Sequence, residues 1–351
     1  MEYGIALVST LDAWKTTKRA EQLGFSHAWF YDTQMLVPDV FVSMALAAAH
    51  TSTIKLGTGV LVPTNRIAPC AANGFASLNK LAPGRIIFGV GTGFTARNTM
   101  GLGPMPLAAL REYIRVVRGL LAGDTVAWDF EGGRRKIRFL NPELGLINIA
   151  DRIPLHISAF GPKARRVAAE IADGWMTFGT LTAQAVQEAE AVAHTCRAVG
   201  RAPETLYRTV FSLGCVLGDG EPYDSARAKA QAGPLVTTVF HGLVEASLPN
   251  LELPAALRPV ADAYRQLYGT YEPADARYLR LHKQHLMGVR PEEGPFVTAE
   301  LIRNLTFTGT VPELRDRLQA LRDAGYNQFV IQLVPGHEAA IEDWARVIER
   351  A

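Results

Sequence analysis

A glycine-containing, basic segment follows one of the apolar runs in this sequence, at a point where a phosphorylated ligand could approach the backbone. It comprises Ala159, Phe160, Gly161, Pro162 and Lys163, and apolar residues after it recur at the spacing of a helix. Proline is favoured in the first turn of a helix, and the free N–H groups and positive dipole of a helix N-terminus attract phosphate. The segment therefore predicts either a phosphate site or an ordinary strand-to-helix turn with solvated basic residues.

A second glycine-rich segment, Gly89–Gly93, closes another apolar run. Gly91 and Gly93, with Thr92 between them, let the backbone come close to a planar or phosphorylated ligand because glycine has no Cβ. The same glycines also suit a tight turn at the end of a strand. The motif by itself favours neither interpretation.

Three polar residues near these runs could take part in catalysis. Asp32 directly follows the run Phe25–Tyr31. A carboxylate at the C-terminal end of a barrel strand is frequently functional, although aspartate also caps helices. Gln34 follows it, and Arg97 lies just past the glycines, where it could bind an anion or face solvent. We assign no catalytic acid or base and keep Asp32, Gln34 and Arg97 as candidates.

The histidines and cysteines do not predict a metal site. His282 and His285 are three residues apart but lack a third ligand or the glutamate of a zinc motif, so we expect a solvated helix face. The three cysteines are scattered, without a CxxC pair, and are expected to be reduced packing residues in a reducing compartment.

Eight apolar runs alternate with longer amphipathic stretches and so predict the elements that position these residues. Continuous apolar strands between helices indicate a buried parallel sheet, and about eight such units are typical of a (β/α)8 TIM barrel. An open, doubly wound sheet is the competing architecture. The runs are Tyr3–Val8, Phe25–Tyr31, Ile54–Val62, Ile86–Gly91, Leu155–Ala159, Trp175–Phe178, Tyr207–Val216 and Gln328–Val334.

Helix signals and long connections complete this outline of one α/β domain over residues 1–351. A helix is predicted from Leu107 to Leu121 by its apolar stripe, and another after the capping box of Thr310 and Glu313. Three excursions are too long for simple connections, and we expect them to form a lid. The excursions after the fourth and seventh strands are expected to lie at the C-terminal mouth of the barrel. The three excursions cover about 93–106, 124–152 (with a predicted hairpin) and 247–304.

Composition excludes several classes of function. A formal net charge of +2 over 351 residues provides no electrostatic case for binding nucleic acid or an anionic membrane. No run approaches the roughly 18 apolar residues of a membrane span, and the N-terminus lacks the pattern of a signal peptide. We therefore expect a cytoplasmic protein.

Several segments, taken together and in order, resemble the luciferase-like superfamily, which includes flavin-dependent monooxygenases and F420-dependent reductases and dehydrogenases. The likeness covers nearly the whole chain, is weakest between Ser247 and Asn304, and is nearest to the branch similar to methylenetetrahydromethanopterin reductase. It is carried by Tyr31–Leu36, Leu56–Thr64, Gly84-Arg85 with Phe88–Gly93, Ala159–Lys163, Phe307–Glu313 and Ala324–Tyr326.

The resemblance implies a (β/α)8 barrel that binds its cofactor at the C-terminal mouth. Gly59 and Val60 would form a bulge, often with a cis peptide bond in this family, against the back of the flavin or deazaflavin ring. The ring or its ribityl chain would lie beside Gly91–Gly93, and Trp175 would form a wall. The phosphate would be held by Ala159, Phe160, Gly161, Pro162 and Lys163, with Asp32 also near the cofactor.

Two departures from the family pattern affect the expected reaction. Thr33 and Gln34 stand where many members have a histidine, and Phe94 stands where the sugar-phosphate dehydrogenase branch has an acidic residue. Both argue against a hydroxyl-oxidising dehydrogenase. The first expectation is therefore a monooxygenase that uses reduced FMN and O2 on a small organic substrate.

The alternatives are an F420-dependent reductase or dehydrogenase and, third, a flavin-binding protein without turnover. F420 has an acidic tail, which would favour a basic groove that could include Arg97, Lys163 and Arg165. The resemblance also implies a homo-oligomer, and the monooxygenase would be served by a separate flavin reductase.

Overall fold

Eight parallel strands close into a barrel in the computed structural model, which describes residues 1–179, 182–245 and 258–349. Their order around the barrel is β1-β10-β9-β8-β7-β4-β3-β2, so the barrel is confirmed and the open sheet is wrong. Each predicted run overlaps one strand, and β1 and β8 begin one residue before their runs. The strands are β1 (Glu2–Leu7), β2 (His27–Phe30), β3 (Lys55–Thr58), β4 (Ile86–Val90), β7 (Leu155–Ser158), β8 (Gly174–Phe178), β9 (Tyr207–Ser212) and β10 (Gln328–Gln332).

Helices follow the strands and cover the outside of the barrel, as the apolar strands require. The stripe predicted from Leu107 forms a helix over Leu107–Leu121, and both halves of the capping box of Thr310 and Glu313 are present. The described helices are α1 (Ala13–Gln22), α2 (Val40–His50), α3 (Ala68–Leu81), α4 (Phe94–Asn98), α5 (Leu107–Leu121), α6 (Pro162–Ile171), α7 (Thr182–Ala198), α8 (Ala226–Val244), α9 (Arg258–Gly269), α10 (Tyr278–Leu281), α11 (Ala299–Leu305), α12 (Val311–Asp323) and α13 (Ala340–Ile348).

Side chains that alternate along the strands form two apolar layers. One layer lies between the strands and the surrounding helices and includes Leu56, Phe88 and Trp175. The other fills the barrel interior and consists of Ala6, Trp29, Ile87, Met176, Phe211 and Val330, with the half-buried Tyr31, Val60 and Phe178 packed against it. The interior is therefore packed, and a ligand can reach only its end.

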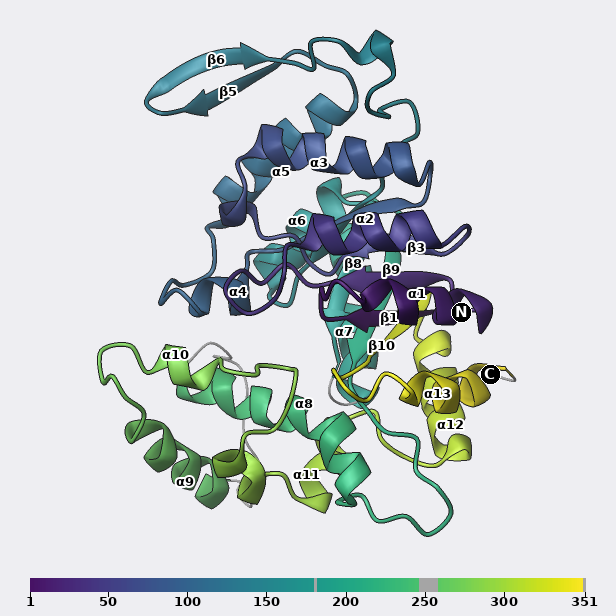
Figure 1. The fold of residues 1–351 in the computed structure, drawn as a ribbon, viewed down its shortest axis with the longest axis vertical. Helices are drawn as coiled ribbons and strands as arrows, with labels where there is room; N and C mark the ends of the chain where they lie inside the picture. Colours follow the sequence, from purple (N-terminus) through teal and green to yellow (C-terminus); the bar gives the residue numbers. More distant parts are fainter. Residues whose placement is uncertain (180–181, 246–257, 350–351) are drawn as a thin grey trace.

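The predicted excursions lie at opposite ends of the molecule. The hairpin of β5 (Val126–Phe130) and β6 (Gly133–Ile137) is confirmed, but it lies between α5 and β7 and therefore at the N-terminal end of the barrel. Figure 1 shows it at one extremity of the long axis and helices α8–α11 toward the other. The expectation of a lid is thus wrong for 124–152.

The late excursion folds as a helical insert, a name we use for residues 258–305. Residues 247–257 of the predicted excursion lie outside the described residues. It contains α9, α10 and α11 and packs on α8 through its own apolar cluster. That cluster consists of Ala232, Val236, Phe240, Tyr264, Tyr271, Leu281, Val297, Leu301 and Ile302. The insert and α8 therefore form a second, smaller core beside the barrel.

The cysteines and the hydropathy of the helices bear on two expectations drawn from composition. All three cysteines are free; Cys196 and Cys215 are buried as predicted, but Cys70 is exposed and does not serve packing. Within the described ranges, no helix has the length and hydropathy needed to cross a membrane.

Candidate active site

The loops after the strands enclose a pocket of about 890 Å³, its open mouth included, at the C-terminal end of the barrel. Of the residues predicted to bind cofactor, Asp32, Gly59, Val60, Gly93 and Phe160 line it. The remaining lining is mostly apolar and comprises Tyr31, Thr33, Leu36, Val37, Val62, Phe94, Thr95, Ala96, Ser158, Met176, Thr177, Phe178, Phe211, His285, Leu286 and Met287. A flat, largely apolar ring suits such a surface, since ligand sites combine apolar walls with a few polar groups.

The bulge after β3 forms one wall of this pocket. The peptide bond between Gly59 and Val60 is cis, as the resemblance implies. The chain beyond it runs close to β4, because a Cβ on Gly91 would lie 2.9 Å from a methyl group of Val60. At Gly89 a Cβ would lie 1.9 Å from the carbonyl oxygen of Thr58. Gly89 and Gly91 therefore allow β3 and β4 and the bulge to approach one another.

Asp32 and Gln34 hold backbone segments that shape the pocket. The carboxylate of Asp32 accepts the Val62 N–H at 2.9 Å and is paired with Arg66 at 2.8 Å, with only 5% of the residue exposed. Gln34 donates to the carbonyl oxygen of Ala96. Asp32 is thus engaged with the chain rather than presented as a free base.

The N-terminus of α6 lies at the edge of the pocket beside Phe160. Gly161 is its N-cap, and the first described intrahelical bond runs from Arg165 N to Gly161 O at 2.9 Å. The N–H groups of Lys163 and Ala164 precede that bond and have no intrahelical acceptor. A Cβ on Gly161 would meet no described atom within 4 Å, so there is open space in front of this helix end. Lys163 is exposed there, and Pro162 is in the first turn.

Two predicted site residues lie elsewhere. Trp175 points out of the barrel, stacks on Tyr326 at 5.9 Å and donates to the carbonyl oxygen of Ala159, so it is not a pocket wall. Its neighbour Met176 faces inward instead, because adjacent side chains of a strand point to opposite faces. Strand alternation was the signal that would have selected Met176.

The catalytic candidate Arg97 and the cofactor candidate Thr92 serve the loop after β4. Arg97 donates its Nε to the carbonyl oxygen of Gly103, and the carbonyl oxygen of Thr92 accepts the Met105 N–H at 2.9 Å. Both contacts hold the excursion 93–106 in place. Neither residue is among those that line the pocket.

A buried hydroxyl at the pocket is left without a partner. The Oη atom of Tyr31 finds no hydrogen-bond partner among the described residues. Burial raises the pKa of this phenol well above its ordinary value, so the group stays protonated and can donate a hydrogen bond. A polar ligand atom in the pocket would satisfy it, because buried polar groups normally have a partner.

The helical insert contributes the opposite wall through His285, Leu286 and Met287. The expectation that His282 and His285 lie on a solvated face is wrong, since they are only 3% and 5% exposed. They pack against His241 of α8, which is 41 residues before His282 in the sequence and so could not be associated with them by spacing. Burial lowers the pKa of His285 well below its ordinary value.

Comparisons with known proteins agree with this geometry. Residues 10–328 match the family model described as luciferase-like monooxygenase. The chain is 29% identical over 349 residues to 5,10-methylenetetrahydromethanopterin reductase of Methanolobus tindarius, covering 97% of this chain and 98% of the relative. It is 31% identical over 250 residues to the F420-dependent hydroxymycolic acid dehydrogenase of Mycobacterium tuberculosis, covering 65% of each chain.

Solved structures share the fold at low sequence identity. The coenzyme F420-dependent tetrahydromethanopterin reductase from Methanopyrus kandleri has a TM-score of 0.71 at 21% identity, covering 99% of this chain and 98% of that one. The FMN-bound oxygenating constituent of 3,6-diketocamphane monooxygenase from Pseudomonas putida has a TM-score of 0.64 at 13% identity, covering 100% and 98%. With the barrel, the cis bond at Gly59 and the family model matched over residues 10–328, the chain belongs to the luciferase-like monooxygenase family.

Proposed function

We propose that this enzyme is an F420-dependent oxidoreductase that transfers hydride between the deazaflavin and a small organic substrate. The observation that carries the proposal is the end-to-end similarity to a methylenetetrahydromethanopterin reductase, supported by the shorter match to an F420-dependent dehydrogenase. The sequence-based expectation of a monooxygenase using reduced FMN takes second place, because the FMN-bound neighbour shares 13% identity and supports the fold alone.

The residues of the pocket fit a bound deazaflavin. The bulge at Gly59 and Val60 would lie against the back of the ring, and the unpartnered hydroxyl of Tyr31 would donate to a polar atom of the cofactor or substrate. The open N-terminus of α6, with Lys163 nearby, would hold the phosphate. When bound, F420 supplies a carbon that donates or accepts a hydride.

The titratable groups around the pocket favour reduction of a substrate that needs no strong proton donor. Among the described lining residues these groups are Tyr31, Asp32 and His285. Asp32 is paired with Arg66, and burial holds Tyr31 protonated and His285 uncharged. Hydride addition to a cationic carbon–nitrogen double bond cancels a charge and requires no acid at the carbon. We therefore propose an iminium-type carbon as the hydride acceptor.

Cofactor titrations test this proposal. Purified protein is titrated with F420 and, separately, with FMN, and binding is followed by fluorescence. We expect F420 to bind at least about tenfold more tightly than FMN, a difference of roughly 1.4 kcal/mol. Reduced F420 is then mixed with cyclic iminium ions, and formation of oxidised F420 is followed at its visible absorbance band.

The opposite result would reinstate the competing reaction. If the protein binds FMN and not F420, and if reduced FMN with O2 oxygenates an organic substrate, the hydride-transfer proposal is wrong. Binding of neither cofactor would reject both. A ketone or alcohol turned over far faster than any iminium ion would reject the substrate class alone.

A further inference from the structure

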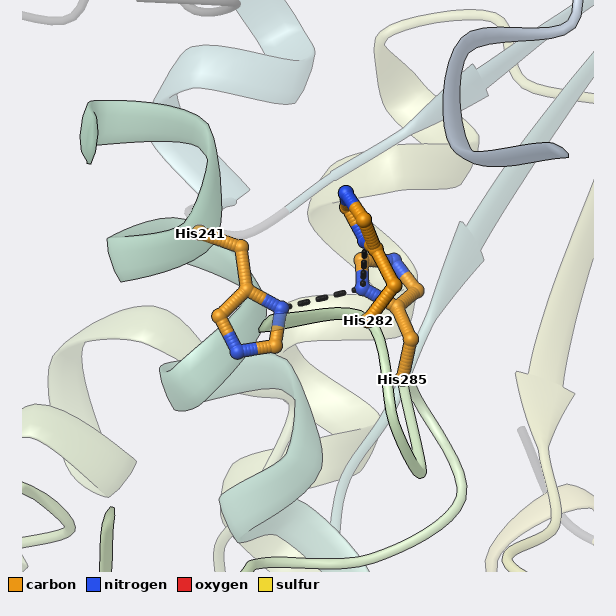
Figure 2. Close-up of side chains that lie close together, drawn as sticks. All are labelled: His241, His282 and His285. Carbon is orange, nitrogen blue, oxygen red and sulfur yellow. Dashed lines mark hydrogen bonds between the residues drawn. The ribbon is translucent and has the colours of Figure 1, made fainter. Parts of the chain in front are cut away.

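Three buried histidine rings converge beside the pocket, from α8 and from the turn after α10 (Figure 2). Nδ1 of His285 lies 3.0 Å from Nδ1 of His241 and 3.3 Å from Nδ1 of His282. One ligand atom from each ring can be chosen so that all three lie within 4.8 Å of one another. The rings therefore direct nitrogen atoms toward one small region of the interior.

Two carboxylates hold the far nitrogens of two of these rings. Nε2 of His241 lies 2.8 Å from Glu293 Oε1, and Nε2 of His282 lies 2.9 Å from Glu245 Oε1. A carboxylate accepts a hydrogen bond, so Nε2 carries the hydrogen and Nδ1 of the neutral ring presents a lone pair. A carboxylate on the far nitrogen is the usual arrangement around a metal-binding histidine, where it fixes the tautomer and increases the basicity of the ligand.

The cluster cannot satisfy its own hydrogen bonds when its rings are neutral. His285 can carry one hydrogen on Nδ1 and donate it to one neighbour, either His241 or His282. The other contact would then bring two acceptors together. A cation bound by all three Nδ1 atoms removes this conflict, and three ligands of a tetrahedral Zn²⁺ ion, each at 2.0–2.1 Å, would lie about 3.3–3.4 Å from one another. The two separations that involve Nδ1 of His285, 3.0 and 3.3 Å, are close to that value.

The turn that carries His285 has an unusual backbone. The residues on both sides of it, Gln284 and Leu286, have φ angles of +61° and +57° although neither is glycine. Such conformations cost free energy and persist where the surrounding structure enforces them, frequently at ligand sites. Here they turn the chain so that the ring of His285 contacts both His241 and His282, and so that Leu286 reaches the pocket.

We propose that His241, His282 and His285 bind one divalent transition-metal ion, with zinc as the metal and water completing the coordination. Imidazole nitrogen is a preferred ligand of Zn²⁺ and of its substitute Co²⁺. The ion would fasten the turn after α10 to α8 and thereby fix the wall formed by His285, Leu286 and Met287. This role is independent of the cofactor that the pocket binds.

Metal analysis of the full chain, purified without a polyhistidine tag, tests the proposal. We expect about one zinc per chain by mass spectrometry after gel filtration, and visible absorption bands of tetrahedral Co²⁺ when the chelated protein is reconstituted with cobalt. His241→Asn and His282→Asn should weaken zinc binding at least a hundredfold and abolish the cobalt bands. His194→Asn, on the exposed face of α7, is the matched control and should bind zinc as the wild type does.

The test distinguishes loss of ligands from loss of fold. Circular dichroism is recorded for every variant, and Glu245→Gln keeps all three rings while removing the charge behind His282. It should lower zinc affinity by roughly 10–100-fold, the usual effect of such a partner. Wild-type protein that retains no zinc and binds none when titrated with Zn²⁺ would overturn the proposal. So would variants lacking His241 or His282 that bind zinc and cobalt as the wild type does.

Discussion

The contacts of Asp32 assign this residue to the architecture of the pocket rather than to proton transfer. Its carboxylate is 5% exposed and holds both the Val62 N–H and the Arg66 guanidinium. The bulge at Gly59 and Val60 lies two residues before Val62, so the carboxylate that holds Val62 helps to position the proposed ring wall. The place of this carboxylate after a strand made it a candidate site residue, but sequence could not show that its partner is Arg66, 34 residues away.

We predict that Asp32→Asn destabilises the protein and weakens cofactor binding. Asparagine keeps an acceptor for Val62 but leaves Arg66 without its buried charge partner, and a hydrogen bond to a charged group contributes about 1.5–3 kcal/mol. The free energy of unfolding, measured in urea, should fall by roughly that amount. The control is Asp39→Asn, because Asp39 also pairs with Arg66 but its side chain is 49% exposed. Equal losses in the two variants would contradict this account.

A second residue-level prediction concerns the open end of α6. Gly161→Asp should weaken binding of the phosphate-bearing cofactor at least about tenfold, because the carboxylate repels the phosphate and occupies its place. Gly161→Ala is the matched control: a Cβ there meets no described atom within 4 Å, and φ is −86°. Fluorescence titration with F420 measures both variants. Unchanged affinity in Gly161→Asp would place the phosphate elsewhere.

Residue-scale prediction from sequence failed where side-chain direction or distant pairing decided the outcome. The family resemblance indicated Trp175, but alternation along β8 turns Met176 inward. Gly89 and Gly91 lack a Cβ because β3 and its bulge pack closely against β4 there, and no local motif reveals this long-range contact. The histidine cluster depends on His241, whose distance from His282 along the chain hides it from any spacing rule.

Elements were more predictable than residues because their signals are local. Strands alternating with amphipathic helices, the stripe of α5 and the capping box of α12 each depend on neighbours within a few residues. The runs nevertheless overestimated strand length. Ile54–Val62 was expected to be strand throughout, but β3 ends at Thr58 and the bulge begins there. Apolar residues past a strand end can line a pocket as readily as continue a sheet.

One element-level contact should make stability depend on pH. Glu21 of α1 accepts the N–H groups of Ser52, Thr53 and Ile54 and so fixes the turn between α2 and β3. Burial opposes its ionisation, but these hydrogen bonds outweigh that effect and hold its pKa at about 2. Because the folded pKa lies below the ordinary value, the stabilisation is complete above about pH 4.5 and is lost as the pH falls toward 2.

We predict that Glu21→Gln lowers the free energy of unfolding by about 1–2 kcal/mol at pH 7, allowing for solvent screening of a half-buried group. Glutamine still offers an oxygen acceptor, so the variant removes the charge alone. The difference from wild type should shrink steadily in urea titrations between pH 4.5 and pH 3. Glu190→Gln, on the exposed face of α7, should show no such change. A difference that is independent of pH would contradict the role of the carboxylate.

At the scale of the whole molecule, the two ends of the barrel carry different excursions of the chain. The hairpin of β5 and β6 lies between α5 and β7, at the N-terminal end, while His285, Leu286 and Met287 of the helical insert line the pocket at the other end. Figure 1 shows the hairpin and the helices of the insert far apart along the long axis. The insert has its own apolar cluster with α8 and meets the mouth of the barrel through few described polar contacts. One is the bond from Gln332 of β10 to the Leu286 carbonyl oxygen at 2.7 Å, and another joins the Thr95 hydroxyl to Nε2 of His285 at 3.3 Å.

This division predicts that the insert opens without unfolding of the barrel. Segments with their own small core and few ties to the rest of a protein open at a lower free energy than its central strands. Hydrogen exchange followed by mass spectrometry should therefore show faster exchange in α9–α11 than in the strands. Gln332→Ala should accelerate exchange in peptides around Leu286 several-fold, because it removes a hydrogen bond of about 0.5–1.5 kcal/mol, and leave the strands unchanged. Gln319→Ala, on the exposed side of α12, is the control.

Ligand binding in the pocket should slow hydrogen exchange in the peptides around Leu286 of the wild type, since Leu286 and Met287 line the pocket. Exchange that rises equally in the strands and the insert would show that the two open as one unit.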